Sequence, residues 1–335
     1  MKYWKGIVAA ALGVAGIAAA GTLGYLQAQL KPLDPEGVEQ PFAIERGTGL
    51  AKIAYQLEGN GLIRNARLFV ALARYRELET GLHAGEFLVS PAWSANEVLD
   101  HLISGKVRSY PVVVPEGLRS PDIATRVEAA GLGSGDEFLA AVNDAEFARE
   151  LGIEATNLEG YLFPDTYRLP KGLTGRAVAR VMVEQFERVW QDIEPLAPAT
   201  GLDRHQIVTL ASIVEKETGA AEERPVIAAV FLNRLQRGMR LETDPTVIFG
   251  IPDFDGNLRR VHLEDESNPY NTYRIRGLPP GPIASPGRDA LRAVVQPATS
   301  DYLFFVARGD GTHKFSVSYA EHDRAVDEFQ RRRRR

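Results

Sequence analysis

The sequence predicts an α+β protein with three parts: an N-terminal transmembrane helix, a small module of strands and helices, and a larger mixed α/β domain. Three observations predict this organisation. An uncharged run at residues 6–30 follows the first lysines. A strand–turn–helix pattern then occurs twice, and the second copy lies 70 residues after the first. The segments richest in motifs that suggest chemistry all lie in the second half of the chain.

The composition is that of a folded globular protein. The chain has 335 residues, of which 44% are hydrophobic and 25% are charged. It contains no cysteine, which excludes disulfides, thiolate metal sites and a cysteine nucleophile. The formal net charge of −5 becomes −10 when the five arginines at residues 331–335 are left out. An acidic body argues against nucleic acid as the main partner, and we interpret residues 331–335 as a solvated basic tail.

Residues 1–30 are predicted to form a short cytoplasmic start and one transmembrane helix. A helix needs about 20 apolar residues to cross a bilayer, and no charge interrupts residues 6–30. Because Lys2 and Lys5 precede this run, the positive-inside tendency leaves the rest of the chain outside the cytoplasm. A cleaved signal peptide is the alternative, since small residues at 18–21 suit a signal peptidase. A linker with two prolines follows at residues 31–40.

Residues 41–109 are predicted to form the small module, and residues 110–330 the larger domain. Each copy of the repeat reads as a strand, a glycine turn, an amphipathic helix and a glycine stop. The first copy has Gly47 and Gly61 where the second has Gly117 and Gly131. A second helix is expected at residues 65–79. With this strand–helix–helix–strand order the module resembles a LysM-type glycan-binding fold; a platform that binds nothing is the alternative.

The segment at residues 206–219, QIVTLASIVEKETG, is predicted to be a helix with two glutamates in its last turn. Its apolar stripe recurs at helical spacing in Ile207, Leu210, Ala211 and Val214. Glu215 and Glu217 lie on the two shoulders of this stripe, and Gly219 is the expected stop. Partial burial and the negative end of the helix dipole both raise the pKa of a carboxyl group. Such a glutamate suits acid-catalysed glycosidic cleavage, and a solvated surface glutamate is the alternative.

Other segments of the second half suggest a binding groove. Residues 237–251 read as a helix end, a strand to Thr243 and an Asp-Pro turn. The proline-rich loop at residues 268–287 suits the wall of a sugar groove, or else pins down a long connection. Residues 302–318 predict a β-hairpin. Phosphate-loop, zinc-protease and nucleophile-elbow motifs do not occur, and among the six histidines only His313, in this hairpin, is a candidate functional residue.

A series of motifs carries a resemblance to a known family. In chain order they are VPEG, LEGYLFPDTY, ASIVEKET, VFLNRL, GMRLETDPTVIFG, PYNTYRIRGLPPGPIASPG and THKFS. Together they resemble the YceG-like family, the endolytic murein transglycosylases, over nearly the whole chain. The resemblance implies cleavage inside peptidoglycan strands, between N-acetylmuramic acid and N-acetylglucosamine. It further implies the C6 hydroxyl as nucleophile, 1,6-anhydro ends as products, and termination of strand elongation.

The resemblance also implies the site residues. One carboxyl group is enough for this reaction, because it protonates the leaving oxygen and then takes the proton of the C6 hydroxyl. The family's acid lies in the motif present here as ASIVEKET, which implies Glu217; Glu215 is the runner-up, and helix geometry alone does not choose between them. The expected groove residues are Asp244, Asn271, Tyr273, Gly277, Leu278, Pro279 and Pro280. Asp165 and Glu116 are assigned structural roles, as turn and cap residues.

The expected partners are peptidoglycan strands, the membrane, and penicillin-binding proteins or other cell-wall synthases. No cofactor, metal or nucleic acid is expected. The predicted location is the bacterial inner membrane, with a single-pass anchor and the catalytic domain on the periplasmic side. Two other functions stay open: a non-catalytic peptidoglycan-binding scaffold for cell-wall synthases, and a hydrolytic muramidase with Asp244 as partner carboxylate.

Overall fold

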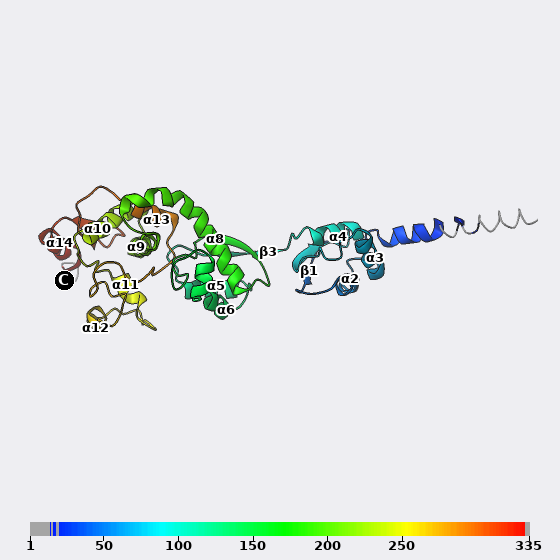
Figure 1. The fold of residues 1–335 in the computed structure, drawn as a ribbon, viewed down its shortest axis with the longest axis horizontal. Helices are drawn as coiled ribbons and strands as arrows, with labels where there is room; N and C mark the ends of the chain where they lie inside the picture. Colours follow the sequence, from blue (N-terminus) through cyan, green and yellow to red (C-terminus); the bar gives the residue numbers. More distant parts are fainter. Residues whose placement is uncertain (1–13, 15, 18–19, 332–335) are drawn as a thin grey trace, which may run out of the picture. The chain divides into compact units, whose positions relative to one another are not determined.

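The computed structural model describes residues 14, 16, 17 and 20–331 of the chain. The chain divides into two compact units (Figure 1). The first contains the residues up to Tyr110 together with Pro170–Gly172, and the second contains Pro111–Leu169 and the chain from Leu173 onward. Helices and short strands are mixed, and every strand of the described residues belongs to a two-stranded sheet.

The predicted transmembrane helix is not found. No helix among residues 14, 16, 17 and 20–331 is long and apolar enough to cross a membrane. The predictions of a single-pass anchor and of an inner-membrane location are therefore wrong for the part of the chain that is described. Residues 1–13, 15, 18 and 19 of the predicted segment lie outside it.

The first unit consists, in chain order, of β1 (Gln40–Ile44), α2 (Leu50–Gly59), α3 (Ala66–Tyr75), β2 (Gly85–Val89) and α4 (Ala95–Ile103). β1 and β2 pair antiparallel with Phe42 opposite Phe87, and both rings are buried. Helix α3 begins after Asn65, whose side chain accepts a hydrogen bond from the backbone N–H of Leu68 at 3.0 Å. It ends at Tyr75, so the helix expected at residues 65–79 is present but shorter.

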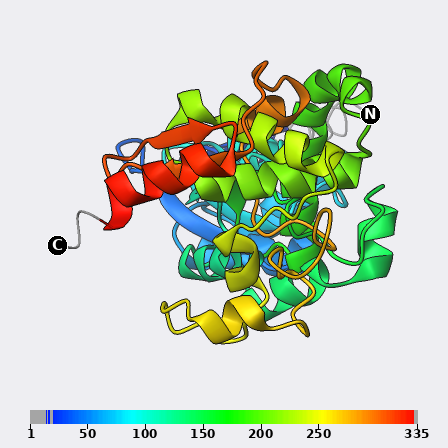
Figure 2. The ribbon, with the colours of Figure 1, turned by 90° about the vertical axis from the view of Figure 1, so that its left-hand side faces the viewer.

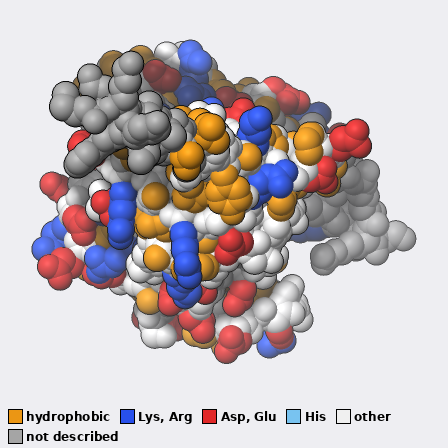
Figure 3. Space-filling model, turned by 90° about the vertical axis from the view of Figure 1, so that its right-hand side faces the viewer, with side chains coloured by type: hydrophobic (Ala, Val, Ile, Leu, Met, Phe, Trp, Pro, Cys, Tyr) orange, Lys and Arg blue, Asp and Glu red, His pale blue; other side chains and the backbone are white. Residues whose placement is uncertain are grey.

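The assignment of residues 41–109 as a LysM-like module is not supported. The strand–helix–helix–strand order is present, but α4 contributes Val98, Leu99 and Leu102 to the same buried core. The unit therefore needs a further helix to close its core. On the face drawn in Figure 3, hydrophobic, basic and acidic side chains are interspersed. The glycan-binding role that came with the assignment has no support in the described residues.

The two copies of the strand–turn–helix pattern share their backbone conformation at the glycines. β1 and α2 form the first copy, and β3 (Ser109–Val113) and α5 (Ser120–Ala129) form the second. Gly47 and Gly117 have φ values of 77° and 75°, and Gly61 and Gly131 have φ values of 66° and 68°. Glycine adopts this left-handed region without steric cost, which explains why both copies carry it at the turn and at the helix stop.

The second unit contains most of β3 and β4 (Thr166–Pro170), which pair with each other. Its other elements are α6 (Gly135–Val142), α7 (Ala145–Glu150), α8 (Gly175–Ile193), η1 (Glu194–Thr200), α9 (Arg204–Glu217), η2 (Ala221–Glu223), α10 (Arg224–Gln236), α11 (Asp244–Phe249), α12 (Arg260–Glu264), α13 (Arg288–Val295), β5 (Phe304–Ala307), β6 (His313–Ser316), α14 (Tyr319–Val326) and η3 (Asp327–Arg331). β5 and β6 form the predicted antiparallel hairpin. Figure 2 shows this hairpin beside α14, with α11 and α12 below the helices α9 and α10.

Helix α9 lies in the interior of the second unit. It begins with a capping box, in which the side chains of Asp203 and Gln206 accept hydrogen bonds from each other's backbone N–H groups. Every residue from Ile207 to Val214 is buried, because α10, α11 and α13 all pack against the helix. The buried surface is wider than the predicted stripe and includes Thr209 and Ser212, whose hydroxyls donate to backbone carbonyls of the same helix.

The strand expected to end at Thr243 is not formed. Residues 239–243 are irregular, and the backbone N–H of Thr243 donates to the hydroxyl of Thr272 at 3.0 Å rather than to a strand. The expected Asp-Pro turn is instead the first turn of α11, which begins at Asp244 with Pro245 next to it. Proline fits there because the first turn of a helix has no partner for its N–H and needs the φ that proline supplies.

Candidate active site

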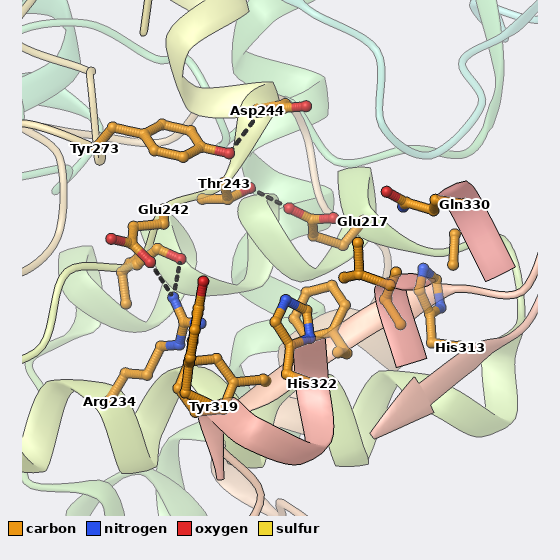
Figure 4. A pocket seen from close by; sticks show the side chains of 16 residues that line it. Glu217, Arg234, Glu242, Thr243, Asp244, Tyr273, His313, Tyr319, His322 and Gln330 are labelled. Carbon is orange, nitrogen blue, oxygen red and sulfur yellow. Dashed lines mark hydrogen bonds and ion pairs between the residues drawn. The ribbon is translucent and has the colours of Figure 1, made fainter. Parts of the chain in front are cut away.

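A cavity of about 430 Å³ lies in the second unit at the C-terminal end of α9. The end of α9, the segment before α11, the β5–β6 hairpin and α14 supply its walls (Figure 4). Phe304 and Phe305 of the hairpin give it an apolar side. The polar side chains that line it are Glu217, Arg234, Glu242, Thr243, Asp244, Tyr273, His313, Tyr319, His322 and Gln330.

Glu217 is the last residue of α9, and its carboxyl group faces the cavity (Figure 4). The chain leaves the helix at Thr218, which is extended, one residue before the predicted glycine stop. The hydroxyl of Thr243 donates a hydrogen bond to Glu217 Oε1. Burial raises the pKa of Glu217, and the negative charge of Asp244 raises it further. The bond from Thr243 and the charge of Arg234 oppose this shift without cancelling it.

A buried threonine network holds Thr243 in place. The hydroxyl of Thr246 donates to the backbone carbonyl of Thr243 at 2.8 Å, and the hydroxyls of Thr246 and Thr272 lie 2.8 Å apart. All three residues are buried. The preceding residue, Glu242, has a φ of 50°, a left-handed conformation that a residue with a side chain rarely adopts. The segment that contacts Glu217 is therefore rigid and locally strained.

Asp244 and Tyr273, two of the predicted groove residues, meet beside Glu217. The Tyr273 hydroxyl donates to Asp244 Oδ1 at 2.8 Å, and burial together with this bond raises the pKa of Tyr273. Arg234 lines the same cavity and donates to the backbone carbonyls of Leu303 and Leu241 at 2.6 and 2.9 Å. The site thus holds a protonatable acid, a fixed carboxylate and a buried guanidinium within one cavity.

The remaining predicted groove residues lie elsewhere. The Asn271 amide is buried and donates to backbone carbonyls of residues 262, 263 and 265, so it shapes the loop from within. Gly277 has a φ of 83° and turns the chain. The carbonyl of Pro280 accepts a hydrogen bond from His205 Nε2 at 3.0 Å. Neither Asn271 nor any residue of the run Gly277, Leu278, Pro279 and Pro280 lines the cavity of Glu217, and their contact with substrate stays a prediction.

The side chain of Glu215, the alternative candidate for the acid, lies outside the cavity of Glu217. Its side chain is 5% exposed and accepts hydrogen bonds from Arg224 Nη2 at 2.8 Å and from the backbone N–H of Gly287 at 3.0 Å. Arg224 also contacts Glu116 at 3.4 Å. Glu215 does not line the cavity of Glu217, and its carboxylate already has two donors. Its place in an ion pair fits a group that anchors the end of α9.

The two residues assigned structural roles have such contacts. Asp165 accepts hydrogen bonds from the backbone N–H of Thr166 and from the side chain of Gln185. Glu116 does not cap a helix, because α5 begins after Arg119. Burial raises the pKa of Glu116, which packs against Gly287 and pairs with Arg224 as described above. Among the described residues, no group of three or more His, Asp or Glu is arranged to hold a metal ion.

The sequence did not indicate the role of several residues in and around the cavity. Thr243 and Glu242 were expected in a strand, and Arg234 in helix α10 had no feature that distinguished it from a surface arginine. Glu223, which bonds to His313, lies in the run of charged residues 222–224, which in the sequence looks like an exposed surface. The family-like motif GMRLETDPTVIFG was the signal that could have directed attention to Thr243, since the residue lies within it, directly before Asp244.

Comparison with known proteins agrees with the motifs. The sequence model of the YceG-like family matches residues 42–328. A Bacillus subtilis protein named endolytic murein transglycosylase is 28% identical over 92% of this chain and 90% of its own length. A Streptococcus pneumoniae protein of the same name, from strain D39, is 29% identical over 93% of this chain, which spans 63% of that longer protein.

A solved structure is also similar. The 2.6 Å crystal structure of a putative YceG-like protein from Listeria monocytogenes is 31% identical to this chain, with a TM-score of 0.59. The match covers 87% of this chain and all of that chain. The family predicted from the motifs is thus confirmed by sequence and by fold. The chain belongs to the YceG-like family.

Proposed function

We propose that this chain is an endolytic murein transglycosylase, a lyase that cuts peptidoglycan glycan strands. Bacterial relatives that match more than nine tenths of this chain carry this name. The observation that carries the proposal is the carboxyl group of Glu217, which faces a cavity at the end of an interior helix with its pKa raised by burial. A carboxyl group that keeps its proton near neutral pH is the acid that cleavage of a glycosidic bond requires.

The proposed reaction takes place inside a strand, at the bond between N-acetylmuramic acid and N-acetylglucosamine. Glu217 gives its proton to the glycosidic oxygen as the bond from that oxygen to C1 breaks. The C6 hydroxyl of the same muramic acid forms a new bond to C1 and loses its proton to a base. The carboxylate left on Glu217 can accept that proton, which returns the enzyme to its starting state. The product is a 1,6-anhydro end, and no water is consumed.

The contacts of Glu217 support this role. The hydroxyl of Thr243 fixes the direction of the carboxyl group, because the threonine network leaves it little freedom. Glu215 is less suited, because Arg224 and Gly287 occupy its oxygens. Termination of strand elongation, and contact with penicillin-binding proteins or other synthases, stay predictions that follow from cutting strands as they are made.

The hydrolytic muramidase is the second candidate, because Asp244 lies next to Glu217 and raises its pKa. A hydrolase needs a carboxylate that is free to activate water or to attack the sugar. Asp244 instead accepts a hydrogen bond from Tyr273, which favours a positioning role. A non-catalytic scaffold would have no use for a buried glutamate with a raised pKa in a cavity.

The test is digestion of purified glycan strands, with the products weighed by mass spectrometry. Anhydro ends lack one water relative to hydrolytic ends, so the native protein should release products of the lower mass. Glu217→Gln keeps the volume but cannot give up a proton, and it should lower the rate by about 10²–10⁴-fold or more. Glu215→Gln should retain most of the activity. Products with the mass of hydrolytic ends, or an active Glu217→Gln, would refute the proposal.

A further inference from the structure

Two side chains of the cavity have a hydrogen-bond donor that no other described residue uses. The first is Arg234, whose side chain is 9% exposed. Its Nε donates to the backbone carbonyl of Leu303 at 2.6 Å, and its Nη1 donates to the carbonyl of Leu241 at 2.9 Å and to Glu242 Oε2 at 3.3 Å. Within the described part of the chain, Nη2 has no acceptor, and it is not enclosed (Figure 4). The guanidinium group is therefore fixed in place with one edge open to the cavity.

The second side chain is His322 of α14, which lines the same cavity. Its Nδ1 is enclosed and has no hydrogen-bond partner among the residues that the structure describes. Burial lowers the pKa of His322, and the positive charge of Arg234 lowers it further, so the ring is neutral near pH 7. The other histidine of the cavity, His313, differs because Glu223 Oε2 lies 2.7 Å from its Nδ1.

The enclosed Nδ1 indicates which nitrogen of His322 carries the ring hydrogen. A neutral imidazole has one N–H donor and one acceptor nitrogen. Buried N–H groups without an acceptor are rarer in proteins than buried acceptors without a donor, so the hydrogen belongs on Nε2. Nε2 is not enclosed, and it has no hydrogen bond to the described residues. His322 therefore presents a second unused donor to the cavity.

The ring of Phe304 brings the two donors into one cluster. Its centroid lies 5.3 Å from that of His322, with the rings stacked, and 5.1 Å from the guanidinium carbon of Arg234. The ring of Tyr319 lies 6.0 Å from Phe304, edge to face, and Val326 lines the cavity as well. Two N–H donors thus stand beside an apolar surface.

This combination suits an amide carbonyl that carries a small apolar group. A carbonyl oxygen has two lone pairs and can accept from both donors. A carboxylate suits the place less well, because Glu217, Glu242 and Asp244 line the same cavity and like charges repel. Both sugars of a peptidoglycan strand carry an acetamido group, which is an amide carbonyl with a methyl group attached. The methyl group is stabilised when it leaves water for the surface of an aromatic ring.

We propose that His322 and Arg234 form a subsite for the acetamido group of a sugar next to the cut bond, an inference that rests on the proposed function. Nε2 of His322 and Nη2 of Arg234 donate to the acetamido oxygen, and the methyl group packs against Phe304 and Tyr319. No proton is transferred at this subsite, and Glu217 stays the single acid and base. The two donors position the strand and select N-acetylated sugars.

The test compares strands with and without their acetamido groups. One deacetylase removes the acetyl group from N-acetylglucosamine and another removes it from N-acetylmuramic acid, and acetic anhydride restores both. The native protein should release anhydro ends from at least one deacetylated substrate with a kcat/KM about 5- to 150-fold lower, because buried donors lose their acceptor. Restored strands should recover the native value. The substrate that is affected identifies which sugar occupies the subsite.

His322→Phe deletes the donor but keeps a ring against Phe304. Its kcat/KM on acetylated strands should be about 3- to 30-fold lower, and its preference for acetylated over deacetylated strands should shrink by the same factor. The comparison of two proteins on two substrates removes the effect of the charged amine, which both proteins meet. The unfolding temperature should not fall, because an enclosed unpaired nitrogen is removed.

Two further variants separate the hydrogen bond from packing. His322→Gln carries an NH₂ donor in place of Nε2 and should keep most of the preference. His101→Phe is the matched control, since His101 also has an enclosed nitrogen without a partner and a pKa lowered by burial. It lies in the first unit, away from the cavity, and this variant should keep the native preference.

The outcomes are distinguishable. A native protein that releases no anhydro ends from any strand refutes the proposed function, and this inference with it. An active native protein without a preference for acetylated strands, or a His322→Phe protein that keeps the native preference, refutes the subsite alone. If His322→Phe does not fold, ring nitrogen chemical shifts of His322 decide the question in ¹⁵N-labelled Glu217→Gln protein. A hydrogen on Nδ1, or an Nε2 signal that acetylated strands do not shift, would overturn the inference.

Discussion

Removal of the hydroxyl that holds Glu217 should change the pH dependence of activity in a defined direction. Thr243→Val keeps the branched shape of a buried side chain but deletes the donor to Glu217 Oε1. The backbone contacts of Thr243 with Thr246 and Thr272 do not use that hydroxyl as donor, so the segment should stay in place. The variant therefore isolates one hydrogen bond.

The size of the effect follows from the kind of bond. A hydrogen bond to a charged group contributes about 1.5–3 kcal/mol. If the bond orients the carboxyl group throughout the reaction, its loss corresponds to a kcat about 10- to 150-fold lower. The bond also favours the carboxylate and lowers the pKa of Glu217, so its removal raises that pKa. The fall of kcat at high pH should therefore move to higher pH.

The assay is the rate of anhydro-end release across the pH range, for native and Thr243→Val proteins. Thr246→Val is the matched control, because Thr246 is also fully buried and its hydroxyl belongs to the same network without touching Glu217. The control should lose stability while the fall at high pH stays where it is. A fall that is unmoved or shifted to lower pH in Thr243→Val, or an equal shift in Thr246→Val, would refute the reasoning.

Two other predictions concern stability. Burial raises the pKa of Glu217, so the native state holds a proton that the unfolded chain releases. The stability that this proton contributes is present at low pH and is lost as the pH rises through the pKa of the native state. In Glu217→Gln the side chain does not titrate, so the thermal unfolding midpoint of the variant should exceed that of the native protein at about pH 8. The difference between the two midpoints should shrink towards about pH 4. A difference that does not depend on pH would contradict this reasoning. Glu159 is buried and accepts hydrogen bonds from the backbone N–H and hydroxyl of Ser120 at 3.1 and 2.6 Å. Glu159→Ala leaves these donors unpaired and should lower the free energy of unfolding, measured in urea, by about 1–3 kcal/mol for each donor. Glu154→Ala, at an exposed position, should change this free energy little. Equal effects of the two substitutions would disprove the role of burial.

The helix that carries the candidate acid was predictable because its signal is local. The spacing of apolar residues in α9 places Glu217 in the last turn, and the structure has it there. The glycines of the repeat were similarly informative, because a left-handed φ restricts the residue type at a single position. These features depend on neighbours a few residues away, which the sequence displays directly.

The contacts that complete the cavity join residues far apart in the sequence, so no local pattern predicts them. Thr243 reaches Glu217 from 26 residues away, and Glu223 reaches His313 from 90 residues away. The dipeptide at Asp244 was misread because the φ of proline suits the start of a helix as well as a turn. The absence of charge at residues 6–30 suggested a membrane span, although alanine and glycine, which dominate it, offer little apolar surface.

The burial of α9 also bears on how the protein loses activity on heating. The amides of the buried stretch Ile207–Val214 are expected to exchange with solvent only when the surrounding unit opens as a whole. We therefore expect α9 to keep its place until the second unit unfolds, so that thermal inactivation coincides with global unfolding. The β5–β6 hairpin forms another wall of the cavity and packs against α14.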